Sequence, residues 1–84
     1  MVMVEITPAA LAQAQALDEP IYSRVLGVIE RLRRWPAVSG AKPLRGPLAG
    51  HYRVRTGDCR IQFRIQGQIL NIERIGHRDG FYED

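Results

Sequence analysis

Apolar and polar residues alternate over two stretches in the second half of the chain. The alternation covers residues 51–55 and resumes over residues 60–65, and Thr56-Gly57-Asp58 between them is typical of a tight turn. Successive side chains of a β-strand point to opposite faces. We therefore expect a hairpin whose core-facing side is formed by Tyr52, Val54, Ile61, Phe63 and Ile65. Its opposite face carries Arg53, Arg55, Arg60 and Arg64.

The start of the chain predicts a short strand and a first helix. Residues 2–6 indicate the strand. Thr7-Pro8 then marks a helix start, because a threonine hydroxyl can cap the first turn and proline is favoured at the first helical position. This alanine-rich helix is expected to end near Leu17.

A second helix is expected to follow, with Asp18 as the residue that caps it. Its apolar residues recur at helical spacing and form one face: Ile21, Val25, Val28, Ile29 and Leu32. The helix should stop at Trp35-Pro36, because the residue before a proline disfavours helical backbone.

The rest of the chain completes the sheet. Residues 36–50 contain three prolines and three glycines and predict a surface loop, which Leu44 and Leu48 should hold against the core. Residues 68–75 predict a last strand that is apolar on both faces, as expected of a central strand. The order β-α-α-β-β-β predicts an α+β fold over a single domain, residues 1–84, with two N-terminal helices on a mostly antiparallel four-stranded sheet.

Charge is concentrated in the second half of the chain. The net charge of +3 arises over residues 42–84, where eight basic residues outnumber five acidic ones. Eleven of the twelve basic residues are arginine, whose planar guanidinium matches the oxygens of phosphate. A basic half of this kind favours a polyanionic partner such as nucleic acid.

Several other classes of protein do not fit this sequence. The single cysteine, Cys59, excludes an intramolecular disulfide, and no Cys/His cluster indicates a metal site. No apolar run reaches the ~20 residues that a membrane span needs. The start of the chain lacks the features of a signal peptide, so we expect a cytoplasmic protein without metal or cofactor.

Three stretches in register with this element order resemble the RelE/ParE superfamily of bacterial toxins. They run from Lys42 to Gly50, from Tyr52 to Ile61 and from Arg74 to Arg78, with Tyr82 beyond. The resemblance implies a RelE-like fold and a ribosome-dependent mRNA endoribonuclease. It also implies an antitoxin partner, acidic in our expectation, that holds the toxin inactive in a hetero-oligomer.

The resemblance also implies roles for individual residues. Arg60, His77, Arg78 and Tyr82 correspond to catalytic positions, whereas Arg53, Arg55, Lys42 and Arg45 correspond to positions that engage substrate. The chain departs from the best-known members at Arg53 and Arg55, where those toxins have lysine. It also departs at Cys59, where tyrosine is common, and in the short spacing between Arg78 and Tyr82.

These residue types suit metal-independent cleavage, in which the 2′-hydroxyl of RNA attacks the neighbouring phosphorus. Arginine stabilises the negative charge that develops on phosphate, but it stays protonated and is a poor acid or base near neutral pH. Histidine titrates near neutral pH, so His77 is the expected proton carrier. His51 is expected to have a structural role or to lie at the edge of the substrate.

Two other functions remain open from the sequence. A ParE-like toxin of the same fold inhibits DNA gyrase by binding and does not cut RNA. A non-catalytic basic module, which binds nucleic acid or only its antitoxin, would have a similar composition. Retention of the basic–histidine–tyrosine set favours the endoribonuclease.

Overall fold

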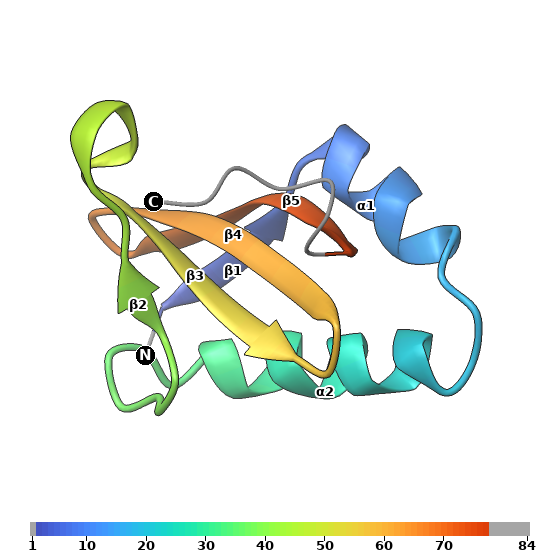
Figure 1. Ribbon diagram of the computed structural model, residues 1–84. Coiled ribbons are helices and arrows are strands. Elements are labelled where there is room, and N and C mark those ends of the chain that lie inside the picture. The colour runs from blue at the N-terminus through green and yellow to red at the C-terminus, as the bar shows by residue number, and fades with distance from the viewer. Residues whose placement is uncertain (1, 78–84) are drawn as a thin grey trace.

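A computed structural model describes residues 2–77 of the chain (Figure 1). The strands are β1 (Met3–Ile6), β2 (Lys42–Pro43), β3 (His51–Thr56), β4 (Cys59–Gln66) and β5 (Ile69–His77). The helices are α1 (Pro8–Gln15), α2 (Ile21–Leu32) and the short 3₁₀ helix η1 (Gly46–Leu48). The expected element order is confirmed, with β2 and η1 added between α2 and β3.

The strands form one sheet in the order β1-β5-β4-β3-β2. β1 runs parallel to β5 and the other pairs are antiparallel, which confirms the mostly antiparallel sheet and the central place of β5. The expected count of four strands is wrong among the described residues, because Lys42 and Pro43 pair with Arg53 and Tyr52 as a fifth. A two-residue strand shows no alternation in sequence, and its proline is tolerated because β2 lies at the sheet edge.

The two helices begin in different ways. The Thr7 hydroxyl accepts a hydrogen bond from the backbone N–H of Ala10 at 3.1 Å, which confirms the expected cap of α1. The expected cap of α2 is wrong: Pro20 occupies that position and Asp18 lies before it. The Glu19 carboxylate instead accepts a hydrogen bond from the backbone N–H of Ser23 at 2.9 Å.

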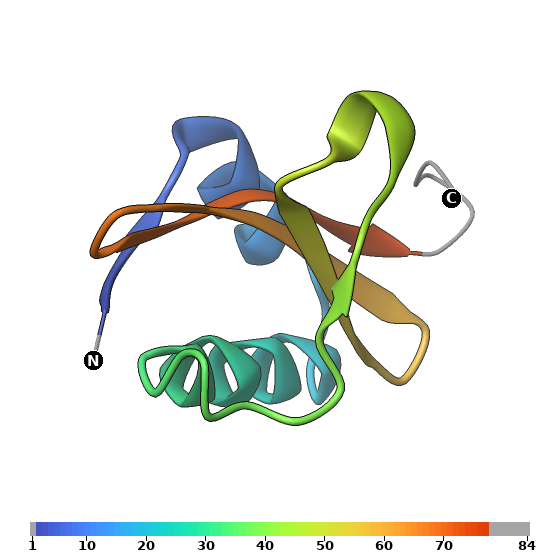
Figure 2. The same ribbon diagram turned by 90° about the vertical axis from the view of Figure 1, so that its left-hand side faces the viewer.

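The core lies between the helices and one face of the sheet (Figure 2). α1 packs against β5, whereas α2 contacts β3 and β4. The apolar face of α2 is confirmed, since Val25, Val28 and Leu32 are buried. Neither described helix is long and apolar enough to cross a membrane.

An aromatic cluster attaches the segment after α2 to the sheet. The Trp35 ring meets Tyr52 and Phe63 edge-on, with centroid distances of 4.7 and 5.3 Å. Edge-to-face contacts of this kind add about 0.5–1.5 kcal/mol beyond area burial. Leu44 is buried and Leu48 half-buried, so the following loop is held to the molecule as expected.

A β-bulge interrupts the pairing of β4 with β5. Phe63 pairs with Ile72 and Gln62 pairs with Arg74, so Glu73 is an extra residue in β5. The bulge explains the spacing of the buried residues of β5. Leu70 and Ile72 are two residues apart, but Ile75 follows three residues later and still faces the core. The expected two apolar faces of this strand therefore reduce to one core face and a half-buried Ile69.

Cys59 is a core residue with 1% exposure. Burial raises the pKa of its thiol above the ordinary value, and the neighbouring Asp58 carboxylate raises it further. A thiol with a raised pKa in the folded state stabilises the fold below the unfolded pKa. This stabilisation is lost as pH rises above the unfolded pKa and through the higher pKa of the folded state.

We predict that a thiol-reactive aromatic disulfide labels native Cys59 slowly and requires a higher pH than the unfolded chain, because the thiolate is the nucleophile. The rate is measured against pH, with and without urea, and the single cysteine makes the signal unambiguous. Equal rates and equal pH profiles in both states would contradict the buried position.

Candidate nucleic-acid interface

The sheet face opposite the core carries five arginines, which we call the arginine face. Strand register arranges them in rows that cross β3, β4 and β5. One row holds Arg55, Arg60 and Gly76; the next holds Lys42, Arg53, Gln62 and Arg74; the third holds His51, Arg64 and Asn71. The expected grouping of Arg53, Arg55, Arg60 and Arg64 is confirmed by this register. Arg74 is an additional member that the sequence reasoning did not single out.

The first row places two like charges next to each other. Arg55 and Arg60 are direct cross-strand partners, a placement that is unfavourable for two cations. Arg55 is exposed, whereas Arg60 and Arg53 are only 5% and 9% exposed. An anion bound between Arg55 and Arg60 would relieve their mutual repulsion. Phosphate suits this position because it can accept hydrogen bonds from both guanidinium groups.

A carboxylate organises the third row. Glu73 Oε1 lies 2.6 Å from His51 Nδ1 and accepts a hydrogen bond from Gln62 Nε2 at 3.4 Å. Its other oxygen lies 3.9 Å from Arg64 Nε. Alternation from the buried Ile72 places Glu73 on the arginine face, and the bulge keeps Arg74 on that face as well, before Ile75 returns to the core. The sequence contained one signal for it, the break in apolar spacing between Ile72 and Ile75.

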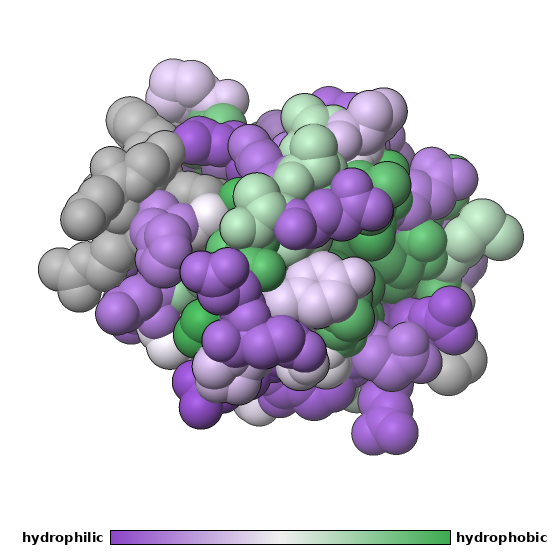
Figure 3. Space-filling view, turned by 90° about the vertical axis from the view of Figure 1, so that its right-hand side faces the viewer, coloured by the Kyte–Doolittle hydropathy of each residue, from purple (hydrophilic) through white to green (hydrophobic). Residues whose placement is uncertain are grey.

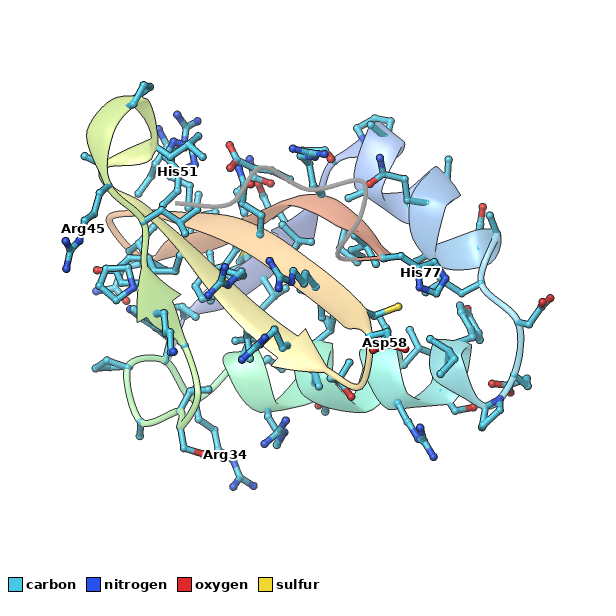
Figure 4. All side chains as sticks on the ribbon, viewed as in Figure 1. Arg34, Arg45, His51, Asp58 and His77 are labelled. Carbon is cyan, nitrogen blue, oxygen red and sulfur yellow. The ribbon has the colours of Figure 1, made fainter. Side chains whose placement is uncertain are left out.

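The two histidines lie at opposite ends of the sheet (Figure 4). His77 ends β5 and pairs with Cys59, while His51 begins β3 and pairs with Arg64. Cys59 points into the core, so the alternation of β5 turns His77 toward the helix side and away from Arg60. Register therefore does not bring His77 onto the arginine face with Arg60, whereas it does place His51 there.

The remaining expected site residues fall in three places. Lys42 is exposed and continues the Arg53 row into β2. Arg45 is exposed before η1, at the same end of the sheet as His51 (Figure 4). Arg78 and Tyr82 lie outside the described residues. Over residues 2–77, no three side chains of the metal-binding types gather into a possible metal site.

Other surfaces differ in character from the arginine face. Arg34 projects from the segment after α2, away from the arginine face (Figure 4), and Arg33 pairs with Glu30 at 3.6 Å. Hydrophobic side chains are exposed over part of the side seen in Figure 3. Among residues 2–77, the large exposed apolar residues are Met3, Leu11 and Leu26, of which the last two belong to α1 and α2.

Comparison with known proteins identifies the family. Residues 4–80 match the family model described as the ParE toxin of the type II toxin–antitoxin system parDE. The chain belongs to the ParE toxin family of type II toxin–antitoxin systems. It is therefore a toxin of a toxin–antitoxin module with a RelE/ParE-type fold. Among curated protein sequences, none matches this toxin.

Solved structures of related toxins have the same fold. The toxin is 31% identical to a chain of the RelBE2 toxin–antitoxin complex from Mycobacterium tuberculosis, with a TM-score of 0.80 over 92% of this chain and 98% of that one. A YoeB/ParE toxin from Agrobacterium tumefaciens is 24% identical over 92% and 99% of the two chains, with a TM-score of 0.75. A chain of the Escherichia coli RelBE complex is 14% identical over 92% and 96%, with a TM-score of 0.76.

We predict that Glu73→Ala destabilises the toxin by about 1–3 kcal/mol, because it leaves His51 and Gln62 without a shared acceptor. Urea unfolding followed by circular dichroism measures the loss. Glu30→Ala is the matched control, since its ion pair with Arg33 is exposed and should contribute no more than about 1 kcal/mol. Equal losses in the two variants would show that the Glu73 contacts contribute little.

Proposed function

We propose that this toxin is a ribosome-dependent mRNA endoribonuclease that acts in the cytoplasm. The observation that supports the proposal best is the direct pairing of Arg55 with Arg60, flanked by the row of Lys42, Arg53 and Arg74. These side chains form a cationic surface spanning three strands beside a two-residue edge strand. Its width suits several successive phosphates of a nucleic-acid strand better than one small anion.

The proposed reaction is attack of the RNA 2′-oxygen on the adjacent phosphorus. The bond from phosphorus to the 5′-oxygen breaks, the 2′-hydroxyl loses its proton, and the leaving 5′-oxygen gains one. Arg60 is assigned to the charge that develops on the phosphate oxygens, because it is almost fully buried and therefore held in place. Arg78 shares this role by resemblance. Arg53 and Arg55 hold the phosphate before reaction.

The remaining roles concern protons and the base. The resemblance assigns proton transfer to His77, whereas the strand register turns His77 away from Arg60 and makes His51 the alternative proton carrier. Tyr82 is assigned to stacking on a base or to a hydrogen bond with phosphate. Lys42 and Arg45 extend the binding surface along its edge. We propose that the ribosome supplies much of the alignment, because bringing the 2′-oxygen into line with the scissile bond lowers the barrier entropically.

We also propose an antitoxin partner with an acidic segment. The relatives from M. tuberculosis and E. coli were solved as toxin–antitoxin complexes. An acidic segment would neutralise the adjacent arginines and block access of RNA. Alternatively, the antitoxin docks across the helices, where Leu11 and Leu26 are exposed.

Inhibition of DNA gyrase is the second candidate function. It is favoured by the family model, which is the one for ParE toxins. The same cationic face could engage gyrase or its DNA without any cleavage. A purely basic binding module is the third candidate.

A bacterial translation extract separates these functions. We predict that the toxin cuts a ribosome-bound message and that the cut is suppressed when ribosomes are removed. A supercoiling assay with purified gyrase runs in parallel. An intact message together with inhibited supercoiling would replace the endoribonuclease with a gyrase inhibitor, and no effect in either assay would support the binding module.

We predict that Arg60→Ala lowers the single-turnover rate of cleavage by ~10²-fold or more with little change in ribosome binding, because its charge acts mainly in the transition state. Arg34→Ala is the control, since Arg34 is exposed away from the arginine face. A loss that high ribosome concentration restores would instead assign Arg60 to substrate binding.

The same assay across pH tests the proton carrier. His77→Ala should slow cleavage and remove one limb of the pH–rate profile. His51→Ala is the comparison, because His51 lies on the arginine face. If His51→Ala removes the limb while His77→Ala does not, the proton-transfer role passes to His51.

A further inference from the structure

A small cavity adjoins the arginine face next to η1. Its volume is about 270 Å³, and it is lined by Pro47 and Leu48 on one side and by Gln62 and Arg74 on the other. The first wall is apolar and comes from the loop, while the second is polar and comes from β4 and β5. A planar heterocycle with polar edges needs this combination of surfaces.

The loop wall is held in place by backbone contacts. The Leu44 N–H donates to the His51 carbonyl at 2.9 Å, and Leu44 itself is 6% exposed. Within η1, the Leu48 N–H donates to the Arg45 carbonyl at 3.2 Å. Gly46 adopts φ of 62°, in the left-handed region that favours glycine, which allows the chain to turn sharply into η1.

The sheet wall of the cavity is held by the contacts of Glu73 with Gln62 and His51. Gln62 is only 6% exposed, and its Nε2 donates to Glu73 Oε1 at 3.4 Å. Glu73 is fixed in turn by His51 at 2.6 Å. The hydrogen bond from Gln62 to Glu73 orients the side-chain amide of Gln62. The amide still has its carbonyl oxygen and a second N–H for other partners.

We propose that this cavity binds a purine base of the RNA substrate, with Gln62 reading its edge. A glutamine amide pairs with N6 and N7 of adenine, and an arginine pairs with N7 and O6 of guanine, so both polar residues of the cavity suit the purine atom N7. Pro47 and Leu48 contact the face of the ring. The inference rests on the proposed action on RNA and specifies the base class that is selected.

The position of Gln62 favours a nucleotide over a protein side chain. It lies between Arg53 and Arg74 in one cross-strand row, and neighbouring strands are about 4.8 Å apart. A base in the cavity therefore lies within a basic row that continues to the exposed Lys42, which can contact the phosphate of the nucleotide. An apolar antitoxin side chain would bury the polar wall without satisfying it.

The test uses mononucleotides, so it does not depend on the ribosome or on cleavage. The full ¹⁵N-labelled toxin is titrated with AMP, 7-deaza-AMP and UMP, and the side-chain amide of Gln62 and the backbone amide of Leu48 are followed by NMR. AMP should shift both signals and bind about tenfold more tightly than the other two, a difference of about 1.4 kcal/mol that is typical of one base contact. UMP retains only the phosphate contact.

Two variants and one control test the two walls separately. Gln62→Ala should abolish the preference for AMP, and Leu48→Ala should weaken AMP binding without altering the sheet. Gln68→Ala is the control, because Gln68 is an exposed glutamine in the turn between β4 and β5. It should bind all three nucleotides as the wild type does.

The outcomes distinguish this site from the proposed function. Equal binding of AMP and UMP, or shifts confined to other residues, would overturn the purine site while leaving ribosome-dependent cleavage intact. A preference for AMP in a toxin that cuts no message would support the site and overturn the endoribonuclease. If AMP causes no shift and Leu48→Ala weakens only antitoxin binding, the cavity belongs to the antitoxin and the proposal fails.

Discussion

The bulge at Glu73 is the constraint on which the arrangement of the arginine face depends. Without an extra residue in β5, strict alternation would send Ile72 and Ile75 to opposite faces of the sheet. The bulge allows both to enter the core, where each is at most 2% exposed. Burying a residue of this size contributes about 1.5–3 kcal/mol, so the shifted register is held by the core itself. The placement of Arg74 on the outer face, next to Glu73, follows from that packing.

The arginine face also contains an acid. Glu73 contacts His51 and Gln62 directly and lies near Arg64, so side chains from three strands share one carboxylate. At the other end of the face, Arg55 and Arg60 lie side by side. The acid therefore lies near the His51 end of the face, and the adjacent arginines lie near the turn between β3 and β4.

Fold and family do not decide between the two activities known for such toxins. The family model is that of ParE, while the structures that share this fold include RelE and YoeB toxins. The same backbone therefore supports different functions, and the chemistry depends on the side chains placed on it. In this toxin those side chains are the three cross-strand rows and the histidines at the two ends of the sheet.

The sequence by itself determined the hairpin, the apolar face of α2 and the gathering of Arg53, Arg55, Arg60 and Arg64 on one face. These features follow from apolar residues that recur every 2 residues in strands and every 3.6 residues in helices. Such periodicity is local, so it is visible without knowledge of how the strands pair. It also predicted the cap at Thr7, because a cap involves residues that are neighbours along the chain.

The tertiary structure decided the contact of His51 with Glu73, the position of His77 on the helix side, the strand β2 and the cavity between Leu48 and Gln62. Each of these joins residues that are distant in sequence; His51 and Glu73 are separated by 22 positions. Such contacts depend on strand register, and a bulge of one residue reverses which face every later side chain occupies. The break in apolar spacing between Ile72 and Ile75 is the one local sign of that reversal, but the core packing that selects it involves residues from the other strands and the helices.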